Sequence, residues 1–469
     1  MSVLAGFMVP HPPMIVPDIG RGSEEQIRET ITAYEKVADE IAELRPDTMI
    51  ITSPHSVMYS DYFHISPGKG AKGSFAGFNA PKVRFDEAYD EEFVSEICRT
   101  ADRAGFPAGT LGERDRQLDH GTMVPLWFIR NRYTEGSIVR IGLSGLPLAD
   151  HYRLGMMIRE ISDTLGRRTV IVASGDLSHK LQDYGPYGYA PEGPVYDERI
   201  MDVMGRAAFG ELLEFDEGFC DRAAECGHRS FVIMAGAMDG QAVRAERLSH
   251  QDVTGVGYGI CTFHPEGSDD SRLFLERFLS SETAKIQNRS ERSDSYVRLA
   301  RFTIEKYVTE GNIPAFPGDI PDDLLSDMPS AMTDKRAGVF VSVHKFGSLR
   351  GCIGTTGPVT GSIAEEIISN AVSASSRDPR FSPIRPDELS YLDISVDVLG
   401  EPEYIDSPDE LDVKRYGVIV SSGMRRGLLL PDLDGVDTVE RQISIAMQKG
   451  GIRPHEKYRL QRFEVIRHH

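Results

Sequence analysis

The sequence predicts an α/β N-terminal domain, with a mostly parallel central sheet flanked by helices, followed by a smaller α+β domain. In the first half, apolar strands alternate with amphipathic helices, which is typical of crossover connections between parallel strands. Residues 264–295 are then polar, apart from one short apolar stretch. The chain has 469 residues, more than a single core usually accommodates, and its hydrophobic content of 40% is enough for well-filled cores.

The first half begins with an apolar strand over 3–9, and a helix over 23–44 follows it. Ser23 and Gln26 have the spacing of a capping box, so we expect the helix to begin at Ser23. The prolines of VPHPP favour an extended backbone around His11, after the first strand. The other expected elements are strands over 48–53, 136–145, 168–176 and 257–263, and a helix over 151–165.

The polar segment predicts the boundary between the two domains. We place the first domain at residues 1–268, a linker at 269–290 and the second domain at 291–469. The second domain mixes strands and helices in an order typical of an α+β fold. Its expected elements are helices over 296–311 and 362–376, and strands over 337–347, 392–399 and 416–431.

Composition excludes several classes of protein. A formal net charge of −20 argues against nucleic acid or an anionic membrane as the main partner. The five cysteines contain no CxxC pair, which argues against a zinc ribbon or a disulfide framework and suits a reducing compartment. No apolar run is long enough to span a bilayer, and the first residues lack the pattern of a signal peptide. We therefore expect a cytoplasmic protein.

Histidines and a carboxylate follow the predicted strands. His11 follows the first strand, His55 follows the second, and Asp176 and His179 follow the fourth. Ligands bind outside the carboxyl ends of the strands in an open α/β sheet, so we expect these side chains to converge at one edge.

Two further residues extend this set: His120 lies in a loop before an apolar run, and Glu225 lies at the start of a predicted apolar helix. Two histidines and a carboxylate form the facial triad of non-haem Fe(II) enzymes, and the same ligand types also suit Zn²⁺. Histidines that do not bind the metal would serve as acid or base, because imidazole titrates near neutral pH.

Five motifs occur in order within roughly residues 1–265: VPHPP, SPHS, LDHGTMVPL, SGDLSH and ECGHRSFVIMAGAM. Together they resemble the landmarks of the LigB-like class III extradiol ring-cleavage dioxygenases and of the related Memo family. The resemblance implies that His11, His55 and Glu225 bind Fe(II). It also implies that His179 is the catalytic acid and base, and that His120 donates to the reacting oxygen.

A cysteine stands beside the expected glutamate ligand. Memo-like proteins resemble the dioxygenases but carry a cysteine in this CG context. Neighbouring side chains of an extended segment point to opposite faces, so only one of Glu225 and Cys226 is expected to reach the metal. A carboxylate favours Fe(II) and oxygen chemistry, whereas a thiolate favours Zn or Cu. We assign the ligand to Glu225, with Cys226 as the alternative, and add Asp176 as a ligand or as a group that holds an imidazole.

Three functional hypotheses follow. The first is an Fe(II)-dependent dioxygenase that inserts both atoms of O₂ into a catechol-type or aminophenol-type ring. The alternative is a metal-binding or scaffold protein with a degenerate site, and the third is a zinc hydrolase that uses metal-bound water as its nucleophile. Proteins resembling this fusion occur with a Memo-like protein and a radical SAM protein, which are the expected partners besides a small aromatic substrate. The sequence does not determine the oligomeric state, and a homo-oligomer is one of the alternatives.

The second half contains LRGCIGT, RDPRFSPI and RGLLLPDLDG, which resemble the AMMECR domain family over about residues 290–469. That family has no established activity, so the resemblance implies only an α+β fold. Cys352, next but one to Arg350, is either a nucleophile with a lowered pKa or a buried strand residue. Arg350, Arg377 and Arg380 form either an anion pocket or ion pairs with carboxylates, and we favour the structural reading of both features.

Overall fold

The computed structural model describes residues 2–112, 117–433 and 435–469. It divides into two units, Met1–Ser280 and Ser281–His469, and we describe each by itself. The segment predicted as a linker is largely helical, because α9 (Phe274–Arg292) runs across the division between the units. Among the described residues, no helix combines the length and the apolar character needed to cross a membrane.

The N-terminal unit is built on a sheet with the strand order β7-β2-β8-β1-β10-β9. The first four of these strands are parallel, and β10 joins β1 in the antiparallel sense. This confirms the mostly parallel central sheet. The strand bounds are β1 (Val3–Val9), β2 (Thr48–Ser53), β7 (Ser137–Gly142), β8 (Thr169–Ser174), β9 (Gln241–Gln251) and β10 (Tyr258–Ser268).

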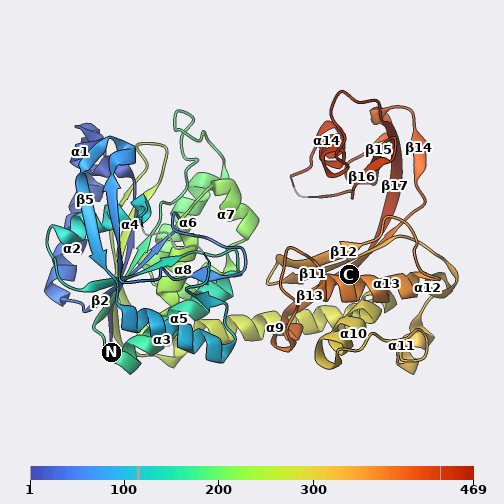
Figure 1. Cartoon of the computed structure of the whole chain (residues 1–469), viewed down its shortest axis with the longest axis horizontal. Helices are drawn as coiled ribbons and strands as arrows, with labels where there is room; N and C mark the ends of the chain where they lie inside the picture. Colours follow the sequence, from blue (N-terminus) through green and yellow to red (C-terminus); the bar gives the residue numbers. More distant parts are fainter. Residues whose placement is uncertain (1, 113–116, 434) are drawn as a thin grey trace. The chain divides into compact units, whose positions relative to one another are not determined.

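Helices cover both faces of this sheet (Figure 1), which explains why its parallel strands are almost continuously apolar. One face packs against α2 (Arg28–Leu44) and α4 (His120–Arg130), where the ring of Tyr34 stacks on Phe128 with centroids 4.1 Å apart. The other face packs against α5 (Leu148–Leu165) and α8 (His228–Gly236), with α3 (Glu91–Ala104) outside α5. The other helices and strands of this unit are α1 (Pro17–Gly20), α6 (Glu192–Gly205), α7 (Glu217–Ala223), β3 (Phe63–His64), β4 (Gly70–Phe75), β5 (Ala80–Ala88) and β6 (Ala108–Gly109).

The predicted capping box at Ser23 is wrong. Residues Ser23–Ile27 form a 3₁₀ turn, and α2 begins only at Arg28. The hydroxyl of Ser23 donates to the carbonyl of Gly20 at 2.7 Å, so it is committed to the preceding turn and caps no helix.

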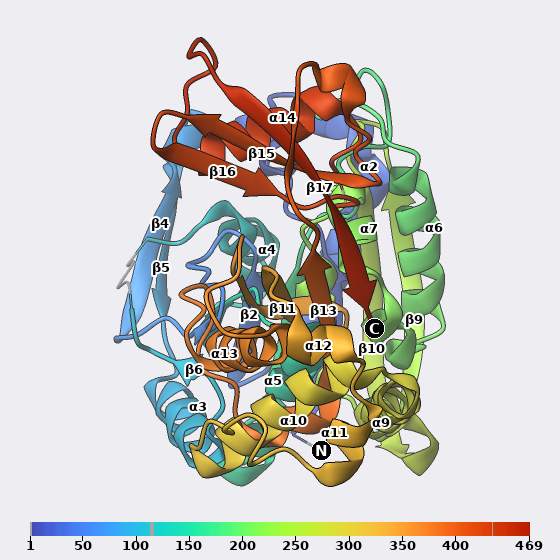
Figure 2. The same ribbon diagram turned by 90° about the vertical axis from the view of Figure 1, so that its right-hand side faces the viewer.

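The C-terminal unit is an antiparallel sheet with helices, which confirms the α+β prediction. Its strands run in the order β12-β11-β13-β17-β15-β16, and β14 also pairs with β17. Helices α10 and α13 pack on the part formed by β11 to β13, while α14 packs against β15 and β16 (Figure 2). The strands are β11 (Val339–Lys345), β12 (Ser348–Gly354), β13 (Leu392–Leu399), β14 (Glu403–Ile405), β15 (Tyr416–Ser422), β16 (Arg425–Leu429) and β17 (Arg459–His468). The helices are α10 (Ser295–Glu310), α11 (Asp322–Asp327), α12 (Ser330–Asp334), α13 (Ile363–Ser376) and α14 (Val439–Lys449).

Candidate metal centre

The carboxyl ends of three neighbouring parallel strands bring the predicted histidines together. β8 lies between β2 and β1 in the sheet. His11 follows β1, His55 follows β2, and Asp176 and His179 follow β8. Residues that are far apart in the sequence therefore meet at one edge of the sheet, which is where ligands bind in open α/β folds.

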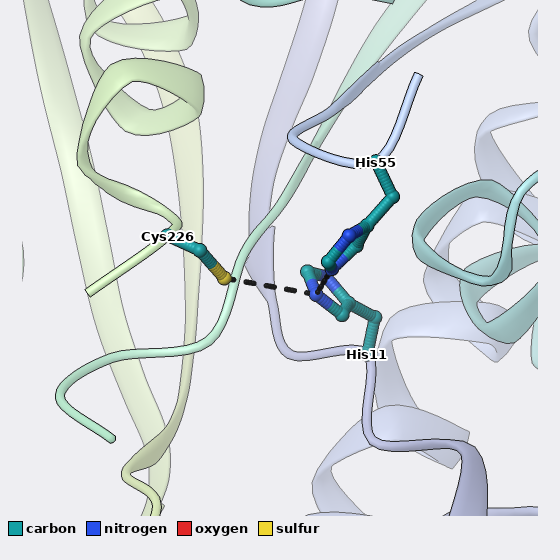
Figure 3. A group of neighbouring side chains, drawn as sticks. All are labelled: His11, His55 and Cys226. Atoms are coloured by element: carbon teal, nitrogen blue, oxygen red, sulfur yellow. Dashed lines mark hydrogen bonds between the residues drawn. The ribbon is translucent and has the colours of Figure 1, made fainter. Parts of the chain in front are cut away.

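Three side chains form the centre of this cluster: His11, His55 and Cys226 (Figure 3). The two histidine Nε2 atoms are 3.0 Å apart, and Sγ of Cys226 lies 3.7 Å from Nε2 of His11. An ion held about 2.0–2.1 Å from two imidazole nitrogens and about 2.3 Å from a thiolate sulfur spaces these atoms by about 3.0–3.7 Å. The donor atoms and their spacing therefore fit a transition-metal ion.

Ser174 determines which nitrogen of His11 is free to bind a metal. Its hydroxyl donates to the carbonyl of Gly121 at 2.6 Å and lies 3.0 Å from Nδ1 of His11. A serine has a single hydroxyl hydrogen, so Ser174 must accept the Nδ1–H of His11. This leaves Nε2 of His11 unprotonated and directed at the other ligand atoms, as a metal-binding histidine requires. Burial, together with His55, lowers the pKa of His11 to about 3, which keeps its ring neutral.

The structure brings Cys226, and not Glu225, to the two histidines. A carboxylate oxygen of Glu225 instead accepts the backbone N–H of His228 at 2.6 Å, at the beginning of α8, where the helix dipole favours negative charge. Burial raises the pKa of Glu225 to about 7. Among the described residues, Glu225 belongs to no cluster of converging ligand atoms. The geometry therefore supports Cys226, the alternative ligand, in place of Glu225.

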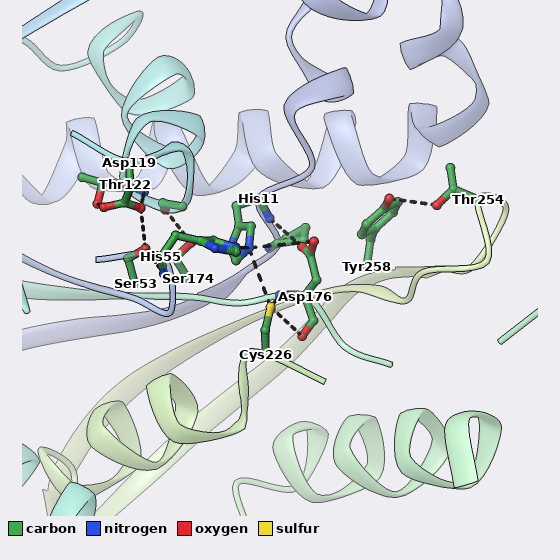
Figure 4. Close-up of polar contacts among 12 residues, drawn as sticks. His11, Ser53, His55, Asp119, Thr122, Ser174, Asp176, Cys226, Thr254 and Tyr258 are labelled. Carbon is green, nitrogen blue, oxygen red and sulfur yellow. Dashed lines mark hydrogen bonds and ion pairs between the residues drawn. The ribbon is translucent and has the colours of Figure 1, made fainter. Parts of the chain in front are cut away.

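Asp176 and His179 flank the cluster and form a second group of ligand atoms with Cys226. The backbone N–H of Asp176 donates to Sγ of Cys226 at 3.3 Å, and its carboxylate accepts the backbone N–H of His11 at 2.7 Å (Figure 4). Burial raises the pKa of Asp176, against the opposing effect of His179. Nδ1 of His179 is buried and has no hydrogen-bond partner in the described part of the chain.

His120 is the first residue of α4 and not, as predicted, a loop residue. The helix begins there because the carboxylate of Asp119 accepts the backbone N–H of Thr122 at 3.0 Å, as an N-cap. The ring of His120 lies 3.9 Å from that of His55 and 5.4 Å from that of His11, between centroids. Burial and these two histidines lower its pKa to about 4. His120 is thus brought to the site, as a neutral imidazole.

Sequence reasoning missed the residues that hold the ligands in place. Ser174 lies inside the SGDLSH motif, and Asp119 directly precedes His120. Asp119 also accepts the hydroxyl of Ser53 at 2.6 Å, and Ser53 in turn accepts the backbone N–H of His55 at 3.2 Å. A helix N-cap signal at Asp119 was available in the sequence, whereas the bond from His11 to Ser174 depends on the pairing of β1 with β8.

In the C-terminal unit the arginines form ion pairs, which confirms the structural reading for Arg350 and Arg380. Arg350 and Lys345 both pair with the buried carboxylate of Glu388, and Arg380 pairs with Asp378. Asp378 also accepts the backbone N–H of Cys352 at 2.9 Å, and the Cys352 thiol accepts the hydroxyl of Ser342 at 3.2 Å. We call Lys345, Arg350, Asp378, Arg380 and Glu388 the charge cluster.

Comparison with known proteins matches both halves of the chain. The family described as the catalytic LigB subunit of aromatic ring-opening dioxygenase matches residues 5–261, and the AMMECR1 family matches residues 297–468. A protein of Clostridium acetobutylicum is 40% identical over 477 residues, which cover 100% of this chain and 99% of that protein. A Thermotoga maritima protein is 49% identical over 158 residues, which cover 34% of this chain and 86% of that protein. The crystal structure of an uncharacterized protein from Pyrococcus horikoshii covers 38% of this chain and 91% of its own, with 30% identity and a TM-score of 0.34.

Proposed function

The chain belongs to the family of the catalytic LigB subunit of aromatic ring-opening dioxygenases, followed by an AMMECR1 domain, and on this basis we propose that it is a metal-dependent oxidoreductase. Its metal would be held by His11, His55 and Cys226, and its substrate would be a small aromatic molecule with an ionisable hydroxyl group, such as a catechol. The observation that carries the proposal is the convergence of three ligand atoms beside two further titratable side chains, Asp176 and His179.

The bound ion would supply redox chemistry and would acidify a hydroxyl group bound to it. Thiolate and imidazole ligands accept iron, copper and zinc, and we propose Fe(II) for an oxygen-dependent reaction. The residues of the chain supply the rest. Nδ1 of His179, which is buried without a partner among the described residues, would accept a substrate proton. His120, whose ring lies next to that of His55, would donate a hydrogen bond to the oxidant.

A second candidate function is favoured by the position of Glu225. Because its carboxylate lies at the beginning of α8, no group of converging ligand atoms among the described residues combines two histidines with one carboxylate, the set found in non-haem Fe(II) oxygenases. This supports a Memo-like metal-binding protein without oxygenase activity, in which the ion has a regulatory or structural role.

Metal content of two neighbouring variants tests the ligand assignment. We expect Cys226→Ser to lose most of the bound metal, because it removes a thiolate ligand. We expect Glu225→Gln to retain the metal, because its amide oxygen still accepts the His228 N–H. Metal analysis of both full-length variants, after loading with Fe(II) or Zn²⁺ and desalting, gives the answer. Loss of metal in Glu225→Gln but not in Cys226→Ser would refute this site.

Oxygen consumption separates the two candidate functions. Fe(II)-loaded protein is prepared without oxygen and then exposed to air with a panel of catechols and aminophenols. Substrate-dependent oxygen uptake with a ring-opened product, absent from His179→Gln at equal metal content, supports the oxidoreductase. Tight metal binding without uptake on any substrate supports the second candidate.

A further inference from the structure

We infer that Asp197 is a positioning residue of the metal centre: its buried carboxylate holds the segment 175–180, which carries Asp176 and His179. The catalytic meaning of this inference rests on the proposed function, but the geometry behind it does not. Asp197 lies in α6, away from the three ligand residues, and none of the motifs discussed above includes it.

The segment after β8 has no helix or strand of its own, so its shape depends on how its backbone N–H groups are satisfied. The N–H of Gly175 donates to the carbonyl of Val9 at 2.9 Å, and the N–H of Leu177 donates to the carbonyl of Gly257 at 2.9 Å. These bonds connect the segment to neighbouring backbone. The N–H of Ser178, directly before His179, donates to a side chain, Oδ1 of Asp197, at 2.8 Å.

Asp197 is held rigidly enough to act as this anchor. It is 2% exposed, and its second oxygen lies 2.9 Å from Nε2 of His250 on β9. Gly257 packs against it so closely that an added Cβ would lie 2.0 Å from Oδ2 of Asp197. One carboxylate therefore connects α6, β9 and the loop of the site, and both of its oxygens are engaged.

The position of His179 depends on this anchor. Its Nδ1 has no hydrogen-bond partner among the described residues, so the position of the ring depends on its contact with the ring of Tyr187, 5.1 Å away between centroids, and on the backbone that carries it. The backbone on its N-terminal side is held by three bonds of Ser178. Its N–H donates to Asp197, its carbonyl accepts the N–H of Gly257 at 2.8 Å, and its hydroxyl donates to the carbonyl of Ala223 at 2.7 Å. Removing the Asp197 carboxylate leaves the Gly257 bond, so we expect the loop to loosen without unfolding of the domain.

The test follows His179 directly, by NMR of metal-free full-length protein labelled at histidine ¹³Cε1, with the His179 signal assigned from His179→Gln. In Asp197→Ala we expect the His179 signal to shift or split, while the signal of His151, buried in α5, stays unchanged. Asp197→Asn keeps an oxygen acceptor for the Ser178 N–H, so its His179 signal should remain close to that of the wild type. A His179 signal in Asp197→Ala that coincides with the wild type overturns the inference, as does an equal shift in both variants.

Metal content and turnover complete the test. Asp197→Ala should bind as much metal as the wild type, because His11, His55 and Cys226 are untouched. Where the wild type shows oxygen-dependent turnover, kcat should fall about 10- to 100-fold in Asp197→Ala and recover in Asp197→Asn. Absence of turnover in the wild type refutes the proposed oxidoreductase, and the NMR comparison then decides the role of Asp197 by itself.

Discussion

The metal centre of the N-terminal unit and the charge cluster of the C-terminal unit both include residues of the quoted motifs, yet their polar groups are satisfied in opposite ways. In the charge cluster, the buried carboxylate of Glu388 meets two cations, and Arg380 meets Asp378. In the metal centre, Nε2 of His11 faces Nε2 of His55, and Nδ1 of His179 has no partner among the described residues.

This difference in the partners of the buried polar groups distinguishes a binding site from a structural motif. Burial alone would raise the pKa of Glu388, but Arg350 and Lys345 lower it to about 2, so the carboxylate is stabilised as an anion by the chain itself. At the metal centre, burial lowers the pKa of His11 to about 3 and raises the pKa values of Asp176 and Cys226, so burial disfavours the charged form of each group. Ligand atoms that lie close together without a countercharge from the chain are suited to a cation from outside.

The largest difference we expect between the two units is in acid unfolding of the metal-free protein. An unfolded histidine binds a proton near pH 6.5, so a folded histidine with a lower pKa makes stability fall as the pH drops below that value. A pKa near 3 makes this loss on the order of 4 kcal/mol by pH 3. The raised pKa values of Glu40, Asp176, Asp197 and Glu225 act in the opposite direction, but their effect ends at about pH 4, where unfolded carboxyl groups titrate, whereas the histidines lose stability down to about pH 3. The histidines that contribute most are His11 and His151, with pKa values of about 3, and His228 and the half-buried His120, with values of about 4.

The contribution of the charge cluster to the stability of the C-terminal unit is lost at a lower pH. The pKa of Asp378 is lowered to about 2 by its hydrogen bonds with Arg380, and that of Glu388 is also about 2, so their contribution is lost between about pH 4.5 and 2.

Trp127, the single tryptophan of the sequence, reports on the N-terminal unit, while circular dichroism reports on both units. On acidification the Trp127 fluorescence transition should come at the higher pH. A circular dichroism change that precedes it would reverse the comparison.

Glu388→Gln should produce the next largest effect. The substitution removes the carboxylate that the buried Lys345 and the half-buried Arg350 share, and breaking a buried ion pair destabilises a protein by about 3–5 kcal/mol. Denaturant unfolding should show an earlier circular dichroism transition with an unchanged Trp127 transition. Glu403→Gln is the matched control, because Glu403 pairs with Arg462 at the surface and should contribute little. Equal effects of the two substitutions would show that the charge cluster is not structural.

Metal binding should stabilise only the N-terminal unit. At a free ion concentration of about 100 times Kd, we expect a gain of about 2.7 kcal/mol in its free energy of unfolding. The Trp127 transition reports this gain, which a chelator should reverse and Cys226→Ser should abolish. A shift of the C-terminal transition on addition of metal would place an ion outside the centre described above.

Ser174→Ala should give the smallest of these effects. Without the acceptor for its Nδ1–H, His11 can exchange the proton between its two nitrogens, and metal affinity should fall by about 10- to 100-fold. Titration with Zn²⁺ against a competing chelator measures this affinity. Ser162→Ala is the control, because Ser162 is equally buried but bonds only to the carbonyl of Ile158 within α5. The same loss of affinity in both variants would argue against a role for the His11 tautomer.

The alternation of strands and helices predicted the N-terminal sheet, because the period of buried side chains is a local property of the sequence. Placing histidines at strand ends was enough to bring His11 and His55 together, since parallel strands end at the same edge. The predicted start of α2 was wrong because the hydroxyl of Ser23 donates to the carbonyl of Gly20. This bond competes with capping of a helix, and the spacing of Ser23 and Gln26 does not reveal it.

The sequence by itself determined the two domains, their families and the residues from which the metal ligands are drawn. Only the tertiary structure decided which member of the adjacent pair Glu225 and Cys226 faces the histidines. The reason is that these residues precede α8 in an irregular segment, where no period sets the side-chain direction. There the free N–H groups at the helix start attract the carboxylate, and the sulfur is left to face the histidines. The same holds for Ser174 and Asp197, whose bonds to the site exist only because distant strands and helices pack together.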